Sequence, residues 1–146
     1  MIIEGFKLSG KLTLALYNAE GDLTLFREMR NLIVQVGKNF GASALIAASA
    51  SPFTNIAVGT GATAPSLADT TLGVETGRVA FSTATVAANV VTMTATFAAG
   101  VASGALQESG IFNSNTAGIM LSRVTFPTIN KGAADSLVIT WGITVG

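Results

Sequence analysis

The stretch Leu137-Val-Ile-Thr-Trp-Gly-Ile-Thr-Val145 carries the clearest structural pattern in this sequence. Every second residue is apolar, and a period of two places alternate side chains on opposite faces of a β-strand. The apolar face consists of Leu137, Ile139, Trp141, Ile143 and Val145. Trp141 is therefore expected in the core rather than on a ligand-binding surface.

Outward from this strand, short apolar or alternating runs separated by turn residues occupy most of the chain. Residues 11–17 alternate and continue beyond the turn Asn18-Ala-Glu-Gly-Asp22 into residues 23–28, which predicts a hairpin. Further strands are expected at 31–36, 53–58, 78–86, 90–97, 106–112 and 119–126. One helix is expected from Lys38 to about Ala48, because the apolar residues of this segment share one helical face. Eight or nine short strands with one short helix near residues 38–48 predict an all-β, mostly antiparallel sandwich or barrel-like domain spanning residues 1–146.

The composition excludes several kinds of chemistry. The 146 residues include no His and no Cys, so the chain cannot build a Ser-His-Asp or Cys-His nucleophile or an ordinary zinc, haem or iron–sulfur site. The formal net charge is zero, whereas nucleic-acid binding needs an excess of Lys and Arg on one face. No segment reaches the roughly 18 continuous apolar residues of a membrane helix, and the N-terminus does not read as a secretory signal. We therefore expect no enzymatic activity, cofactor, metal, nucleic-acid partner or membrane partner.

The proportion of charged residues is unusually low. It is 11%, against about 25% in an average soluble domain. So few charges would leave large apolar patches on a free monomer. We therefore expect a subunit that buries much of its surface against copies of itself or within a larger assembly.

Four isolated charges among apolar neighbours are candidate site residues: Glu75, Arg78, Glu108 and Arg123. Two carboxylates could act as general acid and base, but no cluster of substrate-binding aromatic residues accompanies them. The favoured interpretation is structural, with each carboxylate pairing with an arginine through bidentate hydrogen bonds.

The remaining loop motifs are weaker. Gly59-Thr60-Gly61 lacks the third glycine and the following helix of a dinucleotide-binding loop, so a structural turn is expected. Asp22, Asp69 and Asp135 lie in separate loops, too far apart in sequence for a calcium loop.

A series of short motifs, in a fixed order along the chain, resembles that of a known family of structural proteins. In chain order the motifs are Asn31-Leu-Ile-Val with Gly37, Ile56-Ala-Val-Gly-Thr-Gly61, Asp69-Thr-Thr-Leu72, Glu75 with Arg78, Glu108-Ser-Gly-Ile-Phe112, Gly118-Ile-Met-Leu-Ser-Arg123 with Phe126, Lys131, and Leu137-Val-Ile-Thr-Trp141. This order resembles a small structural module of tailed bacteriophages and is similar to the N-terminal, virion-attaching part of their tail-fibre proteins. The resemblance covers about residues 31–146, a fibre-attachment-like β module. Residues 1–30 lie outside it and are expected to form an added N-terminal hairpin.

The resemblance implies a virion structural protein that is assembled in the host cytoplasm. A fibre module continues into a shaft, whereas this sequence stops at Gly146, so we expect an oligomeric tail, baseplate or fibre-base adaptor subunit. The alternative is a capsid decoration protein that reinforces the outer shell, and a carbohydrate-binding module is a third, less favoured class. The expected partners are the chain itself, as a homo-oligomer for which the resemblance suggests a trimer, and other tail, baseplate or major capsid proteins. The hairpin of residues 11–28 is the candidate docking element, and its candidate site residues are Lys11, Tyr17, Asp22 and Arg27.

Overall fold

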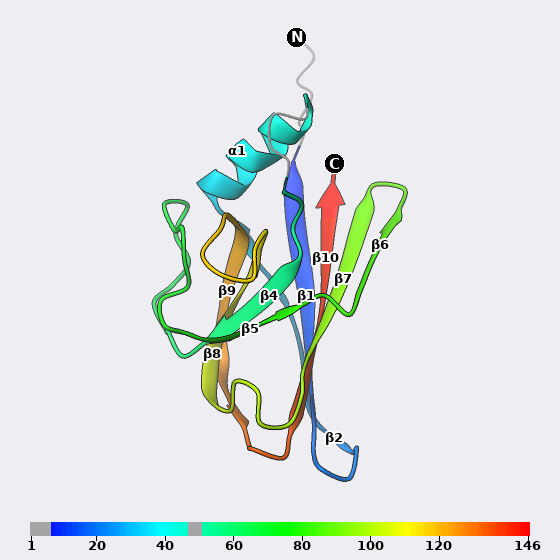
Figure 1. Cartoon of the computed structure of the whole chain (residues 1–146), viewed down its shortest axis with the longest axis vertical. Helices are drawn as coiled ribbons and strands as arrows, with labels where there is room; N and C mark the ends of the chain where they lie inside the picture. The colour runs from blue at the N-terminus through cyan, green and yellow to red at the C-terminus, as the bar shows by residue number, and fades with distance from the viewer. Residues whose placement is uncertain (1–6, 47–50) are drawn as a thin grey trace.

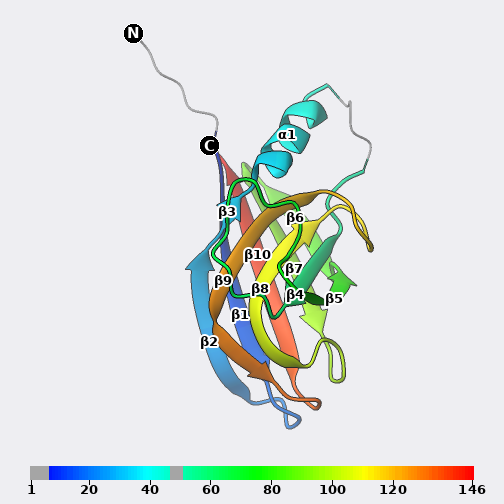
Figure 2. The same ribbon diagram turned by 90° about the vertical axis from the view of Figure 1, so that its left-hand side faces the viewer.

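The computed structural model describes residues 7–46 and 51–146, which form two five-stranded antiparallel sheets packed face to face (Figures 1 and 2). Sheet A has the strand order β2-β1-β10-β7-β6, and sheet B has the order β3-β9-β8-β4-β5. The predicted all-β, mostly antiparallel sandwich is confirmed.

The strand bounds are as follows: β1 Leu8–Tyr17, β2 Leu23–Arg30, β3 Leu32–Ile33, β4 Asn55–Gly59, β5 Glu75–Ala80, β6 Thr83–Ala87, β7 Val90–Phe97, β8 Gly104–Phe112, β9 Met120–Lys131 and β10 Ser136–Val145.

The core lies between the sheets and is built from the alternating faces of their strands. Leu137, Ile139, Trp141 and Ile143 of β10 are all buried, as the period of two predicts. The same cluster contains Leu12, Leu14 and Leu16 of β1 and inward residues of β3, β4, β7, β8 and β9. Burying an aliphatic or aromatic side chain of this size contributes about 1.5–3 kcal/mol, so this layer dominates the stability of the fold.

The first hairpin is part of the sandwich, which corrects the expectation that residues 1–30 form an added extension. Strand β1 lies between β2 and β10 and pairs with β10 from Leu8↔Val145 to Tyr17↔Ser136. Its leucines belong to the main core because they alternate inward in register with the inward residues of β10. Residues 1–6 lie outside the described part of the chain.

The helix α1, Gln35–Ala44, begins three residues earlier than expected and ends before Leu45 (Figure 1). The Val34 N–H donates to the Leu121 carbonyl at 3.1 Å, and Gly37 lies so close to the Leu121 main chain that a Cβ would collide with it. These contacts end the pairing of β3 after two residues, so the strand expected at 31–36 is much shorter. Leu45 is 76% exposed, and the expected end of the helix at Ala48 lies outside the described residues.

Two other expected strands differ in extent. The strand expected at 78–86 divides at Phe81–Ser82, where the chain leaves sheet B as β5 and enters sheet A as β6. The strand expected to end at Phe126 continues through Pro127 to Lys131. The β8–β9 register shifts between Leu106↔Ile129 and Glu108↔Thr125, and at such an irregularity the missing proline N–H costs no ladder bond. The described chain therefore contains ten strands rather than eight or nine.

Candidate functional site

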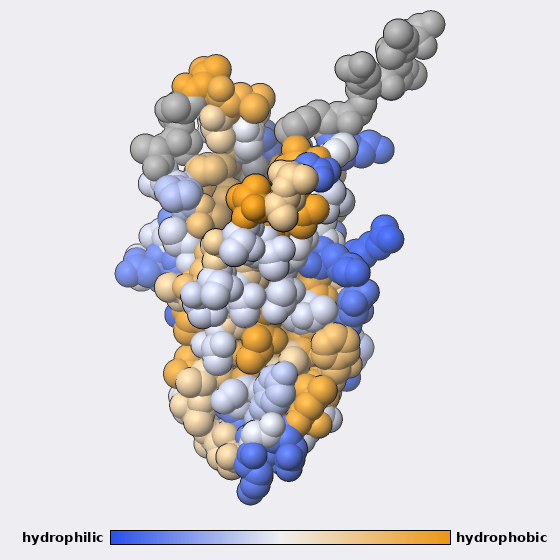
Figure 3. Space-filling model, turned by 90° about the vertical axis from the view of Figure 1, so that its right-hand side faces the viewer, coloured by the Kyte–Doolittle hydropathy of each residue, from blue (hydrophilic) through white to orange (hydrophobic). Residues whose placement is uncertain are grey.

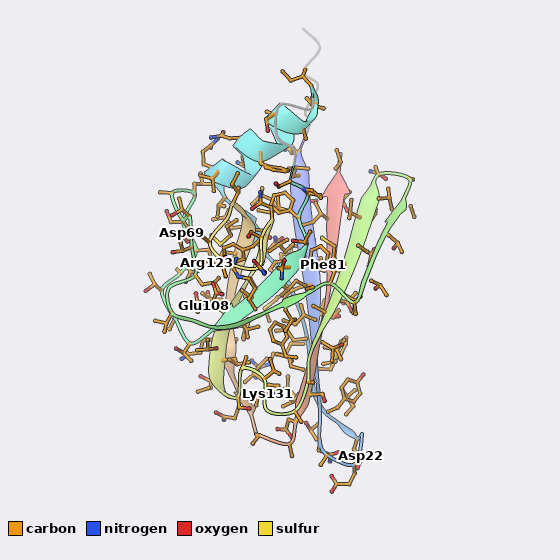
Figure 4. The ribbon with its side chains drawn as sticks, viewed as in Figure 1. Asp22, Asp69, Phe81, Glu108, Arg123 and Lys131 are labelled. Carbon is orange, nitrogen blue, oxygen red and sulfur yellow. The ribbon has the colours of Figure 1, made fainter. Side chains whose placement is uncertain are left out.

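The most constrained polar site is a buried ion-pair cluster between the outer face of sheet B and the loop of residues 60–74. The loop crosses this face, and Leu72 packs with Ala57, Phe112 and Met120 in a second, smaller core. Glu108 on β8 and Arg123 on β9 lie on adjacent strands under the same loop (Figure 4). The two charges therefore lie between a sheet and the segment that covers it.

The carboxylate of Glu108 is completely buried, and every hydrogen-bond donor around it is fixed. Oε1 accepts the N–H groups of Gly61 at 2.9 Å and Val74 at 2.7 Å. Oε2 accepts the Gly73 N–H at 2.8 Å, together with Nε and Nη2 of Arg123 at 3.1 and 2.9 Å. One side chain thus holds both ends of the 60–74 loop on the sheet.

Arg123 extends this cluster to the middle of the loop. Its Nη2 donates to the Thr63 carbonyl at 2.9 Å, and its Nη1 forms an ion pair with Asp69 Oδ2 at 2.9 Å. Asp69 Oδ2 also accepts the Ser66 N–H at 2.9 Å. The planar guanidinium thus joins a buried carboxylate, a loop carbonyl and a half-buried carboxylate in one network.

Burial and hydrogen bonding have opposite effects on the pKa of Glu108. Burial raises the pKa, while the hydrogen bonds from Val74, Gly73, Arg123 and Gly61 lower it, and the net result lies below the ordinary value of 4.5. The carboxylate is therefore held in its charged form, as an acceptor for fixed donors.

The Gly59-Thr60-Gly61 motif forms a structural turn whose glycines make room for Glu108. A Cβ on Gly61 would lie 2.5 Å from Glu108 Oε1, and one on Gly59 would lie 2.6 Å from the same atom. The two glycines are thus needed because a buried carboxylate approaches the main chain closely.

Glu75 and Arg78 form a second cluster on the edge strand β5. Arg78 donates to both oxygens of Glu75, at 3.0 and 2.7 Å, and its Nη1 donates to the carbonyls of Ser114 and Ala117. Its guanidinium carbon lies 3.8 Å from the ring centroid of Phe112. This arginine thereby fixes the loop after β8, as Arg123 fixes the loop before β5.

The structure therefore pairs Glu75 with Arg78 and Glu108 with Arg123, and it does not join the two carboxylates in one site. Asp69 belongs to the Arg123 network, although the sequence suggested only a separate loop acid. The sequence signal for Arg123 is that it is a single charge among apolar residues, which indicates that it needs partners. Its distance along the sequence from Asp69 gives no sign that Asp69 is one of them.

Lys131 is a third cation that contacts a loop, and sequence reasoning gave it no role beyond the resemblance. The residue is 2% exposed, and its Nζ donates to the Ala98 carbonyl at 3.0 Å. Burial lowers the pKa of Lys131 below its ordinary value, with the charge of Asp135 acting in the opposite direction. It holds the β7–β8 loop near the opposite end of the sandwich from α1 (Figure 4).

The four residues of the candidate docking hairpin are dispersed along it. Lys11 forms an exposed ion pair with Glu28 at 3.1 Å, and Arg27 donates to the Pro127 carbonyl. Tyr17 is half-buried at the end of β1, and Asp22 closes the exposed turn through its main chain to Asn18. The structure does not gather these residues into one site.

The described residues contain no group of three or more acidic side chains placed to hold a metal ion. In the same part of the chain, no helix has the length and hydropathy needed to cross a membrane.

No protein-family model, curated protein or solved structure matches this chain.

Proposed function

We propose that this chain is a non-catalytic structural subunit of a virus particle, which acts through its surface and associates with copies of itself. The observation that carries the proposal is the convergence of the motifs that resemble phage fibre-attachment modules. Gly61, Asp69, Glu108 and Arg123 come from separate motifs, yet they form one buried network. The motifs thus supply residues that hold the loop on the sheet, which is the role that a structural module requires of them.

The chemistry of the clusters supports a structural role rather than a catalytic one. Both oxygens of Glu108 are occupied by fixed donors, and the carboxylate has no exposed surface. A general acid or base must reach the proton that it transfers, either directly or through one water. Arg78, Arg123 and Lys131 bind loop carbonyls, so these cations are also used to hold the protein together.

The surface supports association. Several large apolar side chains are more than half exposed, notably Leu45 at 76%, Ile46 at 81%, Val86 at 72% and Phe26 at 58%. With only 11% charged residues, little charge is available to keep such positions apart in solution. Burial against another chain is the physical outcome that this composition favours.

Within the particle, the resemblance favours the tail, at the baseplate or the base of a fibre. Quantitative mass spectrometry of purified particles tests this placement by measuring the copy number of the chain. A small multiple of the tail symmetry is expected. A number that matches the capsid lattice would replace the tail with the capsid decoration role, and absence from the particle would refute the virion proposal.

Self-association is tested separately by sedimentation velocity of the purified chain over a wide concentration range. We expect the mean mass to rise above 14.8 kDa as the concentration increases. A monomer throughout the range would contradict the proposal that the chain associates with itself.

A further inference from the structure

The four edge strands of the sandwich differ in how they are protected against pairing with another chain. Native sheets protect edges with charged residues, prolines or very short strands. Strand β2 carries Arg27, Glu28 and Arg30, strand β5 carries the Glu75–Arg78 pair, and β3 has only two residues. Strand β6, at the other edge of sheet A, has none of these devices.

Within residues 7–46 and 51–146, strand β6 pairs with β7 alone, and its other edge has no strand beside it. All five residues, Thr83-Ala-Thr-Val-Ala87, are exposed, and Val86 is 72% exposed. Residues 79–107, which include β6 and β7, contain no charged side chain. The strand therefore offers unpaired main-chain groups with no electrostatic barrier to a neighbour.

The two faces of β6 have different surroundings. The register Ala84↔Met93 and Val86↔Val91 places Ala84 and Val86 on the inner face, beside an apolar cleft of about 240 Å³ at the open edge of the sandwich. Phe53, Phe81 and Val91 are among the residues that line this cleft. An added strand could therefore bury inward apolar side chains and also complete the hydrogen bonds of the sheet.

The outer face of sheet A is uncharged near β6. The rows Thr83↔Thr94↔Thr140↔Thr13 and Thr85↔Thr92 cross it from the β6 edge. Figure 3 looks onto this face and shows residues of intermediate hydropathy over its centre, with hydrophobic patches above and below them and strongly hydrophilic residues around the rim of the view. The ion pair of Lys11 and Glu28 joins β1 and β2, at the edge of sheet A opposite β6.

We propose that β6 pairs antiparallel with β6 of a second copy of this chain, with a two-fold axis at Thr85. Around a two-fold axis each residue meets the same surface of its partner, so any charge near the axis would meet a like charge. An edge without charges suits such self-pairing, whereas it offers a charged partner nothing to complement. In this register Val86 lies opposite Ala84 of the second copy on the inner face, and Thr83 lies opposite Ala87 on the outer face. The two sheets A become one continuous ten-stranded sheet.

This inference depends on the self-association in the proposed function and assigns it a surface and a symmetry. The pairing closes at two copies, so it differs from the trimer that the resemblance suggests. It also places the interface at the edge of sheet A opposite the 11–28 hairpin.

Cysteine cross-linking tests the register directly, because the natural chain contains no Cys. In an antiparallel pair the two Cα atoms at position 85 lie about 4.5–5.5 Å apart, within the range that a disulfide spans. The T85C variant is therefore expected to form a disulfide-linked dimer under mild oxidation. In T83C the two thiols belong to residues about 13 Å apart, so that variant should remain largely uncrosslinked. L23C, on the exposed start of the opposite edge strand, is the matched control and should also remain uncrosslinked.

Charge pairing at Val86 provides a second test that does not depend on cysteine. The V86K and V86E variants should each sediment as monomers at concentrations where the natural chain associates, since the two like charges then lie on the same face as diagonal neighbours across the axis, about 7–8 Å apart. An equimolar mixture of the two should recover association, because the diagonal neighbours then carry opposite charges. L23K is the matched control and should associate as the natural chain does. Thermal melting of each variant reports whether it is folded.

The outcomes separate the two proposals. The β6 pairing is supported if T85C cross-links while T83C and L23C do not, and if mixing V86K with V86E restores association. Association of the natural chain without either result overturns the β6 pairing and leaves the proposed function standing. Loss of association in L23K instead would assign the interface to the hairpin edge and overturn the β6 pairing as well. A natural chain that never associates would refute both the β6 pairing and the self-association in the proposed function.

Discussion

Replacing Glu108 by Gln is the sharpest test of the buried ion-pair cluster, because the change preserves the shape of the side chain and removes one acceptor oxygen. The natural carboxylate accepts N–H groups on both oxygens, from Gly61 and Val74 on Oε1 and from Gly73 and Arg123 on Oε2. A glutamine amide has one acceptor oxygen and one NH₂ group. Whichever way the amide is turned, its NH₂ group faces at least two fixed N–H donors.

The size of the effect follows from this mismatch. Each buried donor left without an acceptor costs about 1–3 kcal/mol, so two give roughly 2–6 kcal/mol. Breaking a buried ion pair by removing one charge typically costs about 3–5 kcal/mol, which agrees with that range. We therefore expect E108Q to lower the free energy of unfolding by about 3–5 kcal/mol, a large share of the 5–15 kcal/mol typical of a domain.

Urea denaturation measures this loss, provided that the slope of the transition is unchanged. The matched control is E75Q, since Glu75 also pairs with an arginine but its side chain is 35% exposed. The Arg78 side chain is only 7% exposed, but in E75Q it keeps its bonds to the Ser114 and Ala117 carbonyls, and the amide oxygen at position 75 can still accept one hydrogen bond. E75Q should therefore lose only about 0.5–1.5 kcal/mol. Equal effects of the two substitutions, within about 0.5 kcal/mol, would refute the argument that burial makes Glu108 the centre of the cluster.

Three further predictions concern the same clusters. Because the pKa of Glu108 is lowered on folding, its stabilisation is complete above the ordinary value of 4.5 and is lost as the pH falls through the lower native value. The melting temperature of the natural chain should therefore fall more steeply below pH 4.5 than that of E108Q. G61A should cost about 1–3 kcal/mol in urea denaturation, because its Cβ would lie 2.5 Å from Glu108 Oε1. The control is G41A in helix α1, which should be neutral or stabilising because its Cβ would lie at an ordinary 3.5 Å from the Leu8 side chain. Equal effects of the two substitutions would contradict the close-approach explanation. Burial lowers the pKa of Lys131 on folding, so in the alkaline range the unfolded chain binds more protons than the native chain. The free energy of unfolding of the natural chain should therefore rise as the pH increases toward about 10. If the same rise is measured for K131M, another group causes it.

The sequence by itself determined the fold class and the direction in which most strands face. A period of two is a local property, readable from a single strand, and it correctly placed Trp141 and the leucines of residues 12–16 in the core. The low charge and the absence of His and Cys also follow from composition alone.

The ends of several elements depended on contacts that are distant in sequence. Helix α1 has no side chain that caps its first turn, and its start is set by contacts between residues 34–37 and Leu121. The division between β5 and β6 at Phe81–Ser82 follows from the sheets that the two halves join, since β5 belongs to sheet B and β6 to sheet A. Sequence patterns contain no signal for either event.

Only the tertiary structure decided what the charged residues do. Arg123 contacts Glu108, 15 residues away in sequence, and Asp69, 54 residues away, because strand pairing and the 60–74 loop bring them together. The sequence could suggest that isolated charges pair, since an unpaired charge under a loop is costly. It could not say which partners they take, because ion pairing depends on distance in space, and that distance exists only after the sheets have formed.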